Sequence, residues 1–126
     1  MPHVLSNPES TIGRSYLNAG GHAECVELVR QTLHAPPTAL WKEGKKVSSS
    51  DTTISKGTAI ATFVNGKYPQ NRSTGMHAAI YVGQNAIGIQ VLDQFRGQPI
   101  VKPRTIRWNG GPSLSRNGSA FSVIEW

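Results

Sequence analysis

The second half of the chain is built from short apolar segments separated by turn-forming residues, and this alternation constrains the fold more than any other feature. The segments that follow Gly57 are residues 58–64, 77–83, 87–95, 105–108 and 119–126. Their lengths and their content of β-branched and aromatic residues are typical of strands, and Gly, Pro and Asn fill the breaks between them. Because the connections are short, we expect neighbouring strands to pair antiparallel.

One helix is predicted in the first half of the chain, beginning at Cys25 and ending before the APP sequence at residues 35–37. Apolar residues recur at helical spacing at Val26, Val29 and Leu33. The polar residues expected to point outward are Glu27, Arg30 and Gln31. The expected fold is therefore α+β and papain-like, with the helix that carries Cys25 packed on a mostly antiparallel sheet of about five strands. At 126 residues the chain is expected to form one domain, residues 1–126.

Three further segments are predicted to be short or irregular. A second short helix is predicted around residues 38–44, stopped by Gly44. The polar segment 45–57 is predicted to be a surface loop near a binding cleft. The turn-rich segment NGGPSLSRNGS, which begins at Asn109, is predicted to border the cleft before the last strand.

Charge and cysteine content restrict the classes of function. The chain has 13 Lys and Arg against 7 Asp and Glu, a formal charge of +6, which favours anionic surroundings. The basic residues are scattered and 7% of residues are aromatic, so we expect no nucleic-acid partner. A single cysteine cannot form an internal disulfide, which suits folding in a reducing compartment. The sequence shows no signal-peptide pattern and no apolar run of about 20 residues, so we expect synthesis in the cytoplasm and no membrane insertion.

Cys25 occupies a position where a cysteine can act as a nucleophile. The segment GGHAEC leads into the predicted helix, which places the thiol near the positive end of the helix dipole and near unpaired N–H groups. Gly20 and Gly21 are expected to permit close approach of the backbone. The alternative is that Cys25 is a small buried hydrophobic residue, and its position alone does not decide between the two.

A nucleophile requires a base, and His77 opens an apolar segment. If residues 77–83 and 87–95 form a hairpin with a loop at residues 84–86, His77 lies directly opposite Asp93 on the same face of the sheet. Gln94 then points to the other face. Cys25, His77 and Asp93 form the layout of nucleophilic acyl transfer, in which the imidazole takes the thiol proton and the carboxylate orients the imidazole. Taken singly, a strand-edge histidine and a strand-end aspartate also have plain structural interpretations.

No cofactor is expected. The four histidines are widely separated along the chain, and His22, three positions before Cys25, forms only a weak pair that matches no zinc-binding spacing. The acyl-transfer chemistry itself requires no metal.

Four segments together resemble the NlpC/P60 and CHAP group of papain-like cell-wall cysteine peptidases and amidases. They are AECVELVRQ, KGTAIATF, HAAIYVG and VLDQF, in that order along the chain. In that group a Cys opens a helix, a Gly-led strand follows, and a strand-borne His precedes a third polar residue on the next strand. The small size, the absent signal peptide and the sequence ECVELVRQ are more narrowly similar to the type VI secretion amidase effectors, most of all their third family.

The resemblance implies hydrolysis of amide bonds in peptidoglycan stem peptides or crosslinks and, for the third family, of the D,D crosslink between diaminopimelate and D-alanine. It implies an antibacterial toxin that is secreted by a type VI system, acts in the periplasm of a Gram-negative target cell and has a cognate immunity protein. It assigns Cys25 as the nucleophile, His77 as the base and Asp93 as the third member. Tyr16 lies where many relatives carry a tyrosine that helps to bind the oxyanion, although the spacing is shorter here. Glu24, beside the nucleophile, is a candidate for binding a substrate amine.

Two other functions remain open. A phage-type or self-remodelling wall endopeptidase would use the same chemistry, and a neighbouring immunity gene or secretion cluster would distinguish the effector from it. A cationic envelope-binding module would keep the fold without turnover. An activated Cys25 alkylates well below pH 8.5, and an ordinary thiol does not, which separates the enzyme from the binding module.

Overall fold

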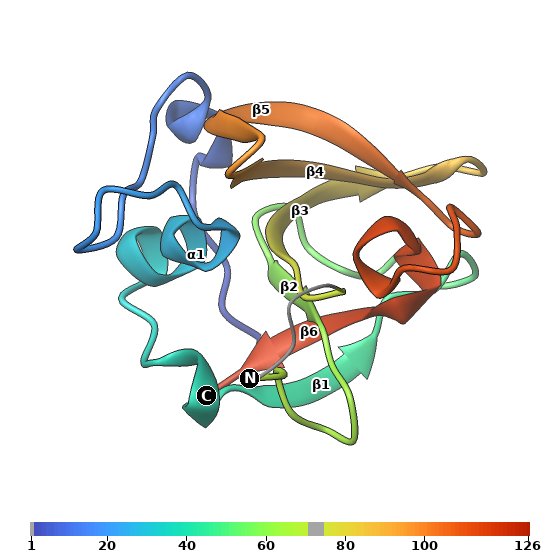
Figure 1. Ribbon diagram of the computed structural model, residues 1–126. Coiled ribbons are helices and arrows are strands. Elements are labelled where there is room, and N and C mark those ends of the chain that lie inside the picture. The colour runs from blue at the N-terminus through green and yellow to red at the C-terminus, as the bar shows by residue number, and fades with distance from the viewer. Residues whose placement is uncertain (1, 71–74) are drawn as a thin grey trace.

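The computed structural model describes residues 2–70 and 75–126 (Figure 1). In the described residues the strands are β1 (Lys42–Lys46), β2 (Ala59–Thr62), β3 (Ala78–Gln84), β4 (Gly88–Phe95), β5 (Gln98–Arg107) and β6 (Phe121–Glu125). The helical segments there are η1 (Pro8–Thr11), α1 (Cys25–Leu33), η2 (Thr38–Leu40), η3 (Leu114–Arg116) and η4 (Gly118–Ala120). Of these, α1 is the one α-helix and the other four are 3-10 turns. Over the same residues, no helix has the length and apolar character needed to cross a bilayer.

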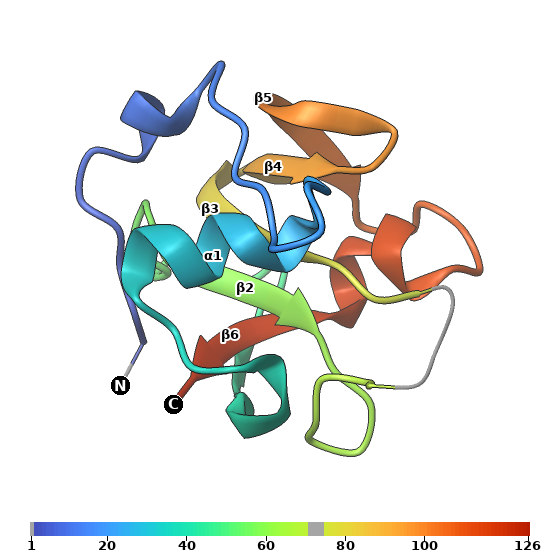
Figure 2. The ribbon, with the colours of Figure 1, turned by 60° about the vertical axis from the view of Figure 1, so that its left-hand side comes forward.

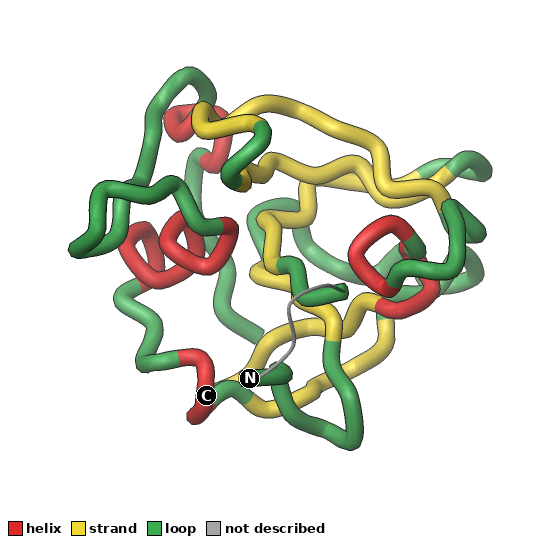
Figure 3. Tube along the Cα trace, in the orientation of Figure 1, coloured by secondary structure: helices red, strands yellow, loops and turns green. Residues whose placement is uncertain are grey.

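All six strands belong to one antiparallel sheet in the order β1-β6-β2-β3-β4-β5. The sheet bends strongly, so that β4 and β5 lie on one side of Figure 1 and β1 and β6 on the other, with β2 and β3 between them. Figure 3 shows α1 on one side of this curved wall and η3 and η4 on the other. The predicted papain-like fold, with a helix packed on about five strands, is therefore wrong: the molecule is a six-stranded antiparallel sheet with one short helix.

The strand that the sequence pattern missed is β1. Its sequence KEGKK has no apolar residue, and four of its five residues are exposed while Gly44 is half-buried. Lys42 pairs with Glu125 and Glu43 with Ile124 of β6, so β1 is an edge strand whose charged side chains face solvent. Charged residues are common on edge strands because they oppose pairing with other molecules. The predicted second helix is reduced to the single turn η2, which ends where β1 begins.

Two apolar clusters cover the two faces of the sheet. The first contains Leu28 and Val29 of α1 together with Ala78, Ile80 and Leu92. The second lies inside the bend of the sheet and contains Ala79, Tyr81, Ile89, Val91 and Phe121. Successive residues of a strand point to opposite faces, so β3 and β4 contribute alternately to the two clusters.

Helix α1 begins and ends where the sequence pattern places it. His34 follows its last residue in a left-handed conformation with φ 53° and closes the helix through a bond from its N–H to the carbonyl of Arg30. The expectation that Glu27 faces solvent is wrong, because Glu27 is buried and accepts bonds from Arg30 and Gln31. The segment before the helix covers this side (Figure 2). The Gln31 side chain donates to the carbonyl of Leu17 in that segment at 2.8 Å.

The hairpin of β3 and β4 forms, but its predicted register is wrong. Ile80 pairs with Leu92, and a bulge interrupts the pairing nearer the turn. Extending the observed pairing by one position places Asp93 opposite Ala79 and not opposite His77. The displacement is two residues, so His77 and Asp93 still project from the same face.

The sequence NGKYPQN, residues 65–71, predicts a turn after the segment 58–64. A turn is observed at Asn65 and Gly66, with both residues at positive φ and reciprocal bonds between Val64 and Lys67. Asn71, at the end of the same predicted turn segment, lies outside the described residues.

Candidate active site

A tight loop delivers Cys25 to the start of α1. The side-chain oxygen of Asn18 accepts bonds from the N–H groups of Gly20 and His22 at 2.9 and 3.0 Å. Gly21 has φ 81°, a conformation that favours glycine, whereas a Cβ on Gly20 would make only ordinary contacts. The two glycines therefore form part of the turn. The close approach of another backbone segment, which the sequence predicted, is not observed at either glycine.

Gln94 anchors this loop to β4. Its buried side chain accepts a bond from the N–H of Tyr16 and donates to the carbonyls of Tyr16 and Glu24. Glu24 is the residue before Cys25, so the bond at 2.8 Å to its carbonyl fixes the backbone immediately next to the thiol. Gln94 points to the face opposite Asp93, as the alternation of the strand requires.

The Cys25 thiol is half-buried and lies between His77 and Tyr68. Its Sγ is 3.9 Å from the hydroxyl of Tyr68. Burial raises the pKa of the thiol, but hydrogen bonding to His77 and the charge of His77 oppose burial, helped by the N–H of Ala78 and the Tyr68 hydroxyl. The net result is a pKa below the ordinary value, which favours the thiolate.

His77 is buried at the start of β3, with 5% of its surface exposed. Its N–H donates to the hydroxyl of Thr62 at 3.1 Å, and its Nε2 lies 2.7 Å from Oδ2 of Asp93. Burial alone would lower the pKa of the imidazole, but hydrogen bonds to Asp93 and Cys25 and the charges of both raise it to about 9. Because Nε2 is engaged with Asp93, Nδ1 is the nitrogen left for the thiol.

Asp93 is fully buried on β4 and is held by Arg104 of β5. The Arg104 guanidinium donates from Nε to both carboxylate oxygens, at 3.1 and 3.0 Å, and from Nη2 to Oδ2 at 2.6 Å. Burial raises the pKa of this carboxyl, but the hydrogen bonds and charges of His77 and Arg104 hold it below the usual range. Asp93 is thus an ionised carboxylate with one oxygen fixed toward the imidazole.

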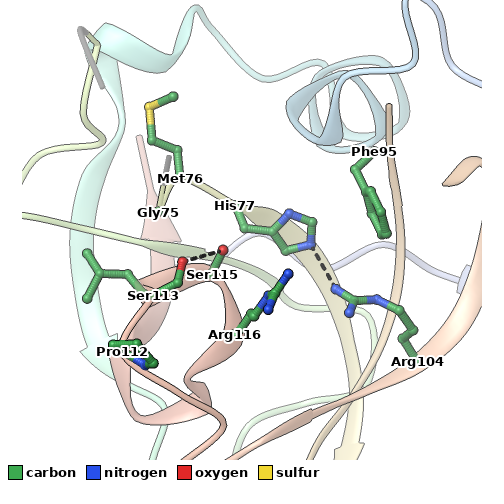
Figure 4. A pocket seen from close by; sticks show the side chains of 10 residues that line it. Gly75, Met76, His77, Phe95, Arg104, Pro112, Ser113, Ser115 and Arg116 are labelled. Atoms are coloured by element: carbon green, nitrogen blue, oxygen red, sulfur yellow. Dashed lines mark hydrogen bonds between the residues drawn. The ribbon is translucent and has the colours of Figure 1, made fainter. Parts of the chain in front are cut away.

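A cleft of about 720 Å³ opens next to His77. One wall contains His77, Phe95 and Arg104, and residues 112–116 form the wall opposite, as Figure 4 shows. The prediction that the segment after Asn109 borders a cleft is confirmed. The predicted loop at residues 45–57 does not line this cleft. Its residues Lys45, Thr53, Ile54 and Ser55 line a separate pocket of about 270 Å³.

Tyr16 and Glu24 have other partners than those the sequence suggested. Tyr16 packs against the first apolar cluster through its side chain and bonds to Gln94 through its backbone. The phenol that the structure brings to the thiol is that of Tyr68. The carboxylate of Glu24 accepts bonds from Nε and Nη2 of Arg96, both at 2.7 Å, so it is already paired with a cation.

The structure brings together the three residues that the sequence predicts for the site, Cys25, His77 and Asp93. The residues that hold them in place were not predicted. Tyr68 lies in the predicted turn segment, and Arg104 lies between breaks in the apolar pattern. Neither position therefore showed a sequence pattern that would indicate a role at the site. Gln94 showed such a pattern: it is a polar residue inside an apolar strand, at a position that the strand alternation assigns to a buried face.

The chain was compared with known proteins. The family model of domesticated amidase effector 2 matches residues 3–124. The type VI secretion amidase effector 2 protein of Salmonella typhi is 35% identical over 137 residues, covering 99% of this chain and 100% of that protein. Domesticated amidase effector 2 of Ixodes scapularis is 38% identical over 105 residues, covering 81% of this chain and 70% of that protein. A solved structure of type 6 secretion amidase effector 2 has a TM-score of 0.85 at 34% identity and covers 97% of this chain and 93% of its own.

A likeness in sequence and fold over nearly the whole length defines the class of protein as that of the amidase effectors. Within this class, the chain belongs to the amidase effector 2 family. The family named by the comparisons is the second, whereas the resemblance read from the sequence indicated the third.

Proposed function

We propose that this protein is a peptidoglycan amidase with a catalytic cysteine, acting as an antibacterial type VI effector. The observation that carries the proposal is the bond of 2.7 Å between Nε2 of His77 and Oδ2 of Asp93, next to a Cys25 thiol whose pKa is lowered mainly by His77 against the effect of burial. The family membership supports the amidase activity, because both curated relatives are named amidase effectors. The order Cys, His, Asp along the chain is also that of the NlpC/P60 group.

In the first half-reaction Cys25 is the nucleophile. The raised pKa of His77 and the lowered pKa of Cys25 favour an imidazolium paired with a thiolate at neutral pH. The thiolate attacks the amide carbonyl carbon and forms a C–S bond, and the carbonyl oxygen takes the negative charge. His77 then gives its proton to the leaving nitrogen, the C–N bond breaks, and a thioester and a free amine remain.

In the second half-reaction water replaces the amine. His77, now neutral, takes a proton from the water as the water oxygen attacks the thioester. Collapse of this intermediate breaks the C–S bond and releases a carboxylic acid and the thiolate. Asp93 keeps the proton-bearing Nε2 toward itself throughout, so Nδ1 stays directed at the thiol and the leaving group.

The oxyanion requires hydrogen-bond donors beside the thiol. The N–H of Cys25 at the first turn of α1 has no partner within the helix and is oriented by the helix start. The Tyr68 hydroxyl lies 3.9 Å from Sγ and can donate a hydrogen bond there. We assign Tyr68 this role in place of Tyr16.

The proposed substrate is the peptide part of peptidoglycan, and the proposed scissile bond is the D,D crosslink between diaminopimelate and D-alanine. A net charge of +6 concentrates the enzyme at an anionic envelope. The proposal treats residues 1–126 as one catalytic domain that is delivered by the type VI system to the periplasm of a Gram-negative target. The proposal also includes a cognate immunity protein that blocks the cleft.

Digestion of intact diaminopimelate-type sacculi tests the proposed function. The protein is compared with Cys25→Ala and His77→Ala, and the released fragments are separated by chromatography and identified by mass spectrometry. We expect crosslinked dimers to be converted to intact tetrapeptide monomers by the wild type and by neither variant. Shortened stems would move the cut to the glutamyl-diaminopimelate bond. Full activity of Cys25→Ala would refute the cysteine mechanism, and the absence of any change with wild type would favour a binding module.

A further inference from the structure

The cleft beside His77 is lined by cationic side chains. Two of its lining residues are arginines, Arg104 from β5 and Arg116 at the end of η3, and none of the described lining residues is acidic. Figure 4 shows their side chains extending from separate elements toward the region of His77. The hydroxyls of Ser113 and Ser115, 3.0 Å apart, lie on the same wall as Arg116.

Of the two arginines, Arg116 is the one available to a ligand. Arg104 is committed to the Asp93 carboxylate through Nε and Nη2. The guanidinium of Arg116 is exposed and makes no hydrogen bond or ion pair with any described residue. The cleft therefore presents one fully charged fork-shaped donor, of the geometry that binds a carboxylate through two parallel bonds.

The position of Arg116 is set by folded structure around it. Its N–H donates to the carbonyl of Ser113 at 3.1 Å, which closes the turn η3. A side chain at Gly110 would collide with the carbonyl oxygen of Arg116, so the wall depends on glycine at that position. The segment after η3 is bonded back to Trp108, the residue that follows β5, through the N–H and hydroxyl of Ser119, which both donate to the Trp108 carbonyl.

The charges at the site do not balance without a substrate anion. At neutral pH the proposed reactive form carries positive charge on His77, Arg104 and Arg116. It carries negative charge on Cys25 and Asp93. One positive charge is left over, and Arg116 is the group that has no counter-ion among the described residues.

We propose that the cleft is a subsite for a free carboxylate on the carbon that bears the scissile amide nitrogen, with Arg116 as its main ligand. This inference rests on the proposed function. In the D,D crosslink the scissile nitrogen belongs to an amino acid centre of diaminopimelate that also carries a free carboxylate. His77 must reach that nitrogen to protonate it, so the carboxylate on the adjacent carbon lies beside His77, where the cleft is.

The subsite also distinguishes between the bonds in a stem peptide. At the bond between glutamate and diaminopimelate, the carbon that bears the scissile nitrogen has its carboxyl group in an amide and not free. That bond offers the cleft no carboxylate at the required position. Arg116 thus favours the crosslink as the bond to be cut.

Two synthetic crosslinked tetrapeptide dimers test the subsite. They differ at one position, where the carboxylate next to the crosslink nitrogen is either free or converted to a primary carboxamide. The KM and kcat for each are measured with wild type, Arg116→Gln, Arg116→Lys and Arg107→Gln. Arg107 is an exposed arginine of β5 outside the cleft, so its variant controls for loss of one positive charge.

We expect the carboxamide to raise the KM of wild type about tenfold, the lower end of the range for a hydrogen bond to a charged group. Arg116→Gln is expected to raise the KM for the free carboxylate by the same factor, to leave kcat nearly unchanged and to bind the two dimers equally. Arg116→Lys is expected to keep part of the preference for the free carboxylate. The control variant Arg107→Gln is expected to keep all of it. Equal KM values of the two dimers with wild type, or an unchanged preference in Arg116→Gln, would overturn the proposal.

A binding measurement separates this inference from the proposed function. Calorimetry with Cys25→Ala gives the Kd of each dimer without turnover. If wild type cleaves neither dimer but Cys25→Ala binds the carboxylate form about tenfold more tightly, the proposed function fails and the subsite stands. If wild type cleaves both dimers and Cys25→Ala binds them equally, the function stands and the subsite is refuted.

Discussion

Replacing Asp93 by Asn removes one of the two negative charges that keep His77 protonated. The pKa of His77 is raised from 6.5 to about 9, which corresponds to a preference of about 3 kcal/mol for the imidazolium. Burial opposes this preference, and Asp93 and Cys25 together produce it. Loss of the Asp93 charge is expected to lower the pKa of His77 by about 1 to 1.5 units, or about 2 kcal/mol, which lowers the ratio of the ion pair to the neutral pair roughly 10- to 30-fold.

The ratio of the ion pair to the neutral pair sets the rate at which iodoacetamide alkylates Cys25. This rate is measured by intact mass as a function of pH. We expect the wild-type rate to reach its plateau well below pH 8.5, and the midpoint for Asp93→Asn to move upward by about 1 to 1.5 pH units, with kcat/KM on sacculi falling roughly 10- to 30-fold. Asp51→Asn is the matched control, because Asp51 pairs with Lys45 on an exposed loop. The thermal midpoint of each variant verifies the fold. A folded Asp93→Asn protein with the wild-type alkylation profile would refute the role assigned to the carboxylate.

Three further predictions concern proton transfer and the supports of the site. Activity is expected to fall above about pH 9, as His77 loses the proton that the leaving group needs, and to fall in acid as the Cys25 thiolate is protonated; a kcat/KM profile against pH measures both limits. Gln94→Ala leaves partly buried backbone groups of Tyr16 and Glu24 without their partner, so we expect a loss of stability of about 2 to 4 kcal/mol in urea unfolding, and an unchanged midpoint would contradict it. Gly110→Ala is expected to raise the KM for the carboxylate dimer while leaving alkylation of Cys25 at the wild-type rate, because it displaces the cleft wall and not the thiol.

The sequence predicted the elements that have clear periodicity. Helix α1 starts at Cys25 because apolar residues recur at helical spacing from that point and prolines follow its end. The segments at residues 77–83 and 87–95 correspond to β3 and β4, which are rich in apolar residues and separated by a polar turn. These are also the elements that carry Cys25, His77 and Asp93, so the proximity of the three residues could be inferred without knowing the sheet order.

The two edge strands could not be predicted in the same way. β1 has no apolar alternation, and β5 extends over Gln98–Arg107 although the pattern indicated only residues 105–108. Pro99 and Pro103 interrupt the apolar pattern of β5, but β5 is at the edge of the sheet, where a missing N–H costs little. Arg104 lies in the part of β5 that was missed, and the support of Asp93 was missed with it.

One strand fixes both halves of the proposed catalytic pair. Asp93 and Gln94 are consecutive on β4, so their side chains leave opposite faces of the sheet. Asp93 holds the imidazole of His77, while Gln94 holds the carbonyl of the residue before Cys25. Because both bonds come from the same two residues of a buried strand, the distance between thiol and imidazole depends on the sheet and not on the loop that precedes α1. A variant that loosens the loop but keeps Gln94 should therefore retain an activated thiol, whereas a variant at Gln94 should lose it even where the helix still forms.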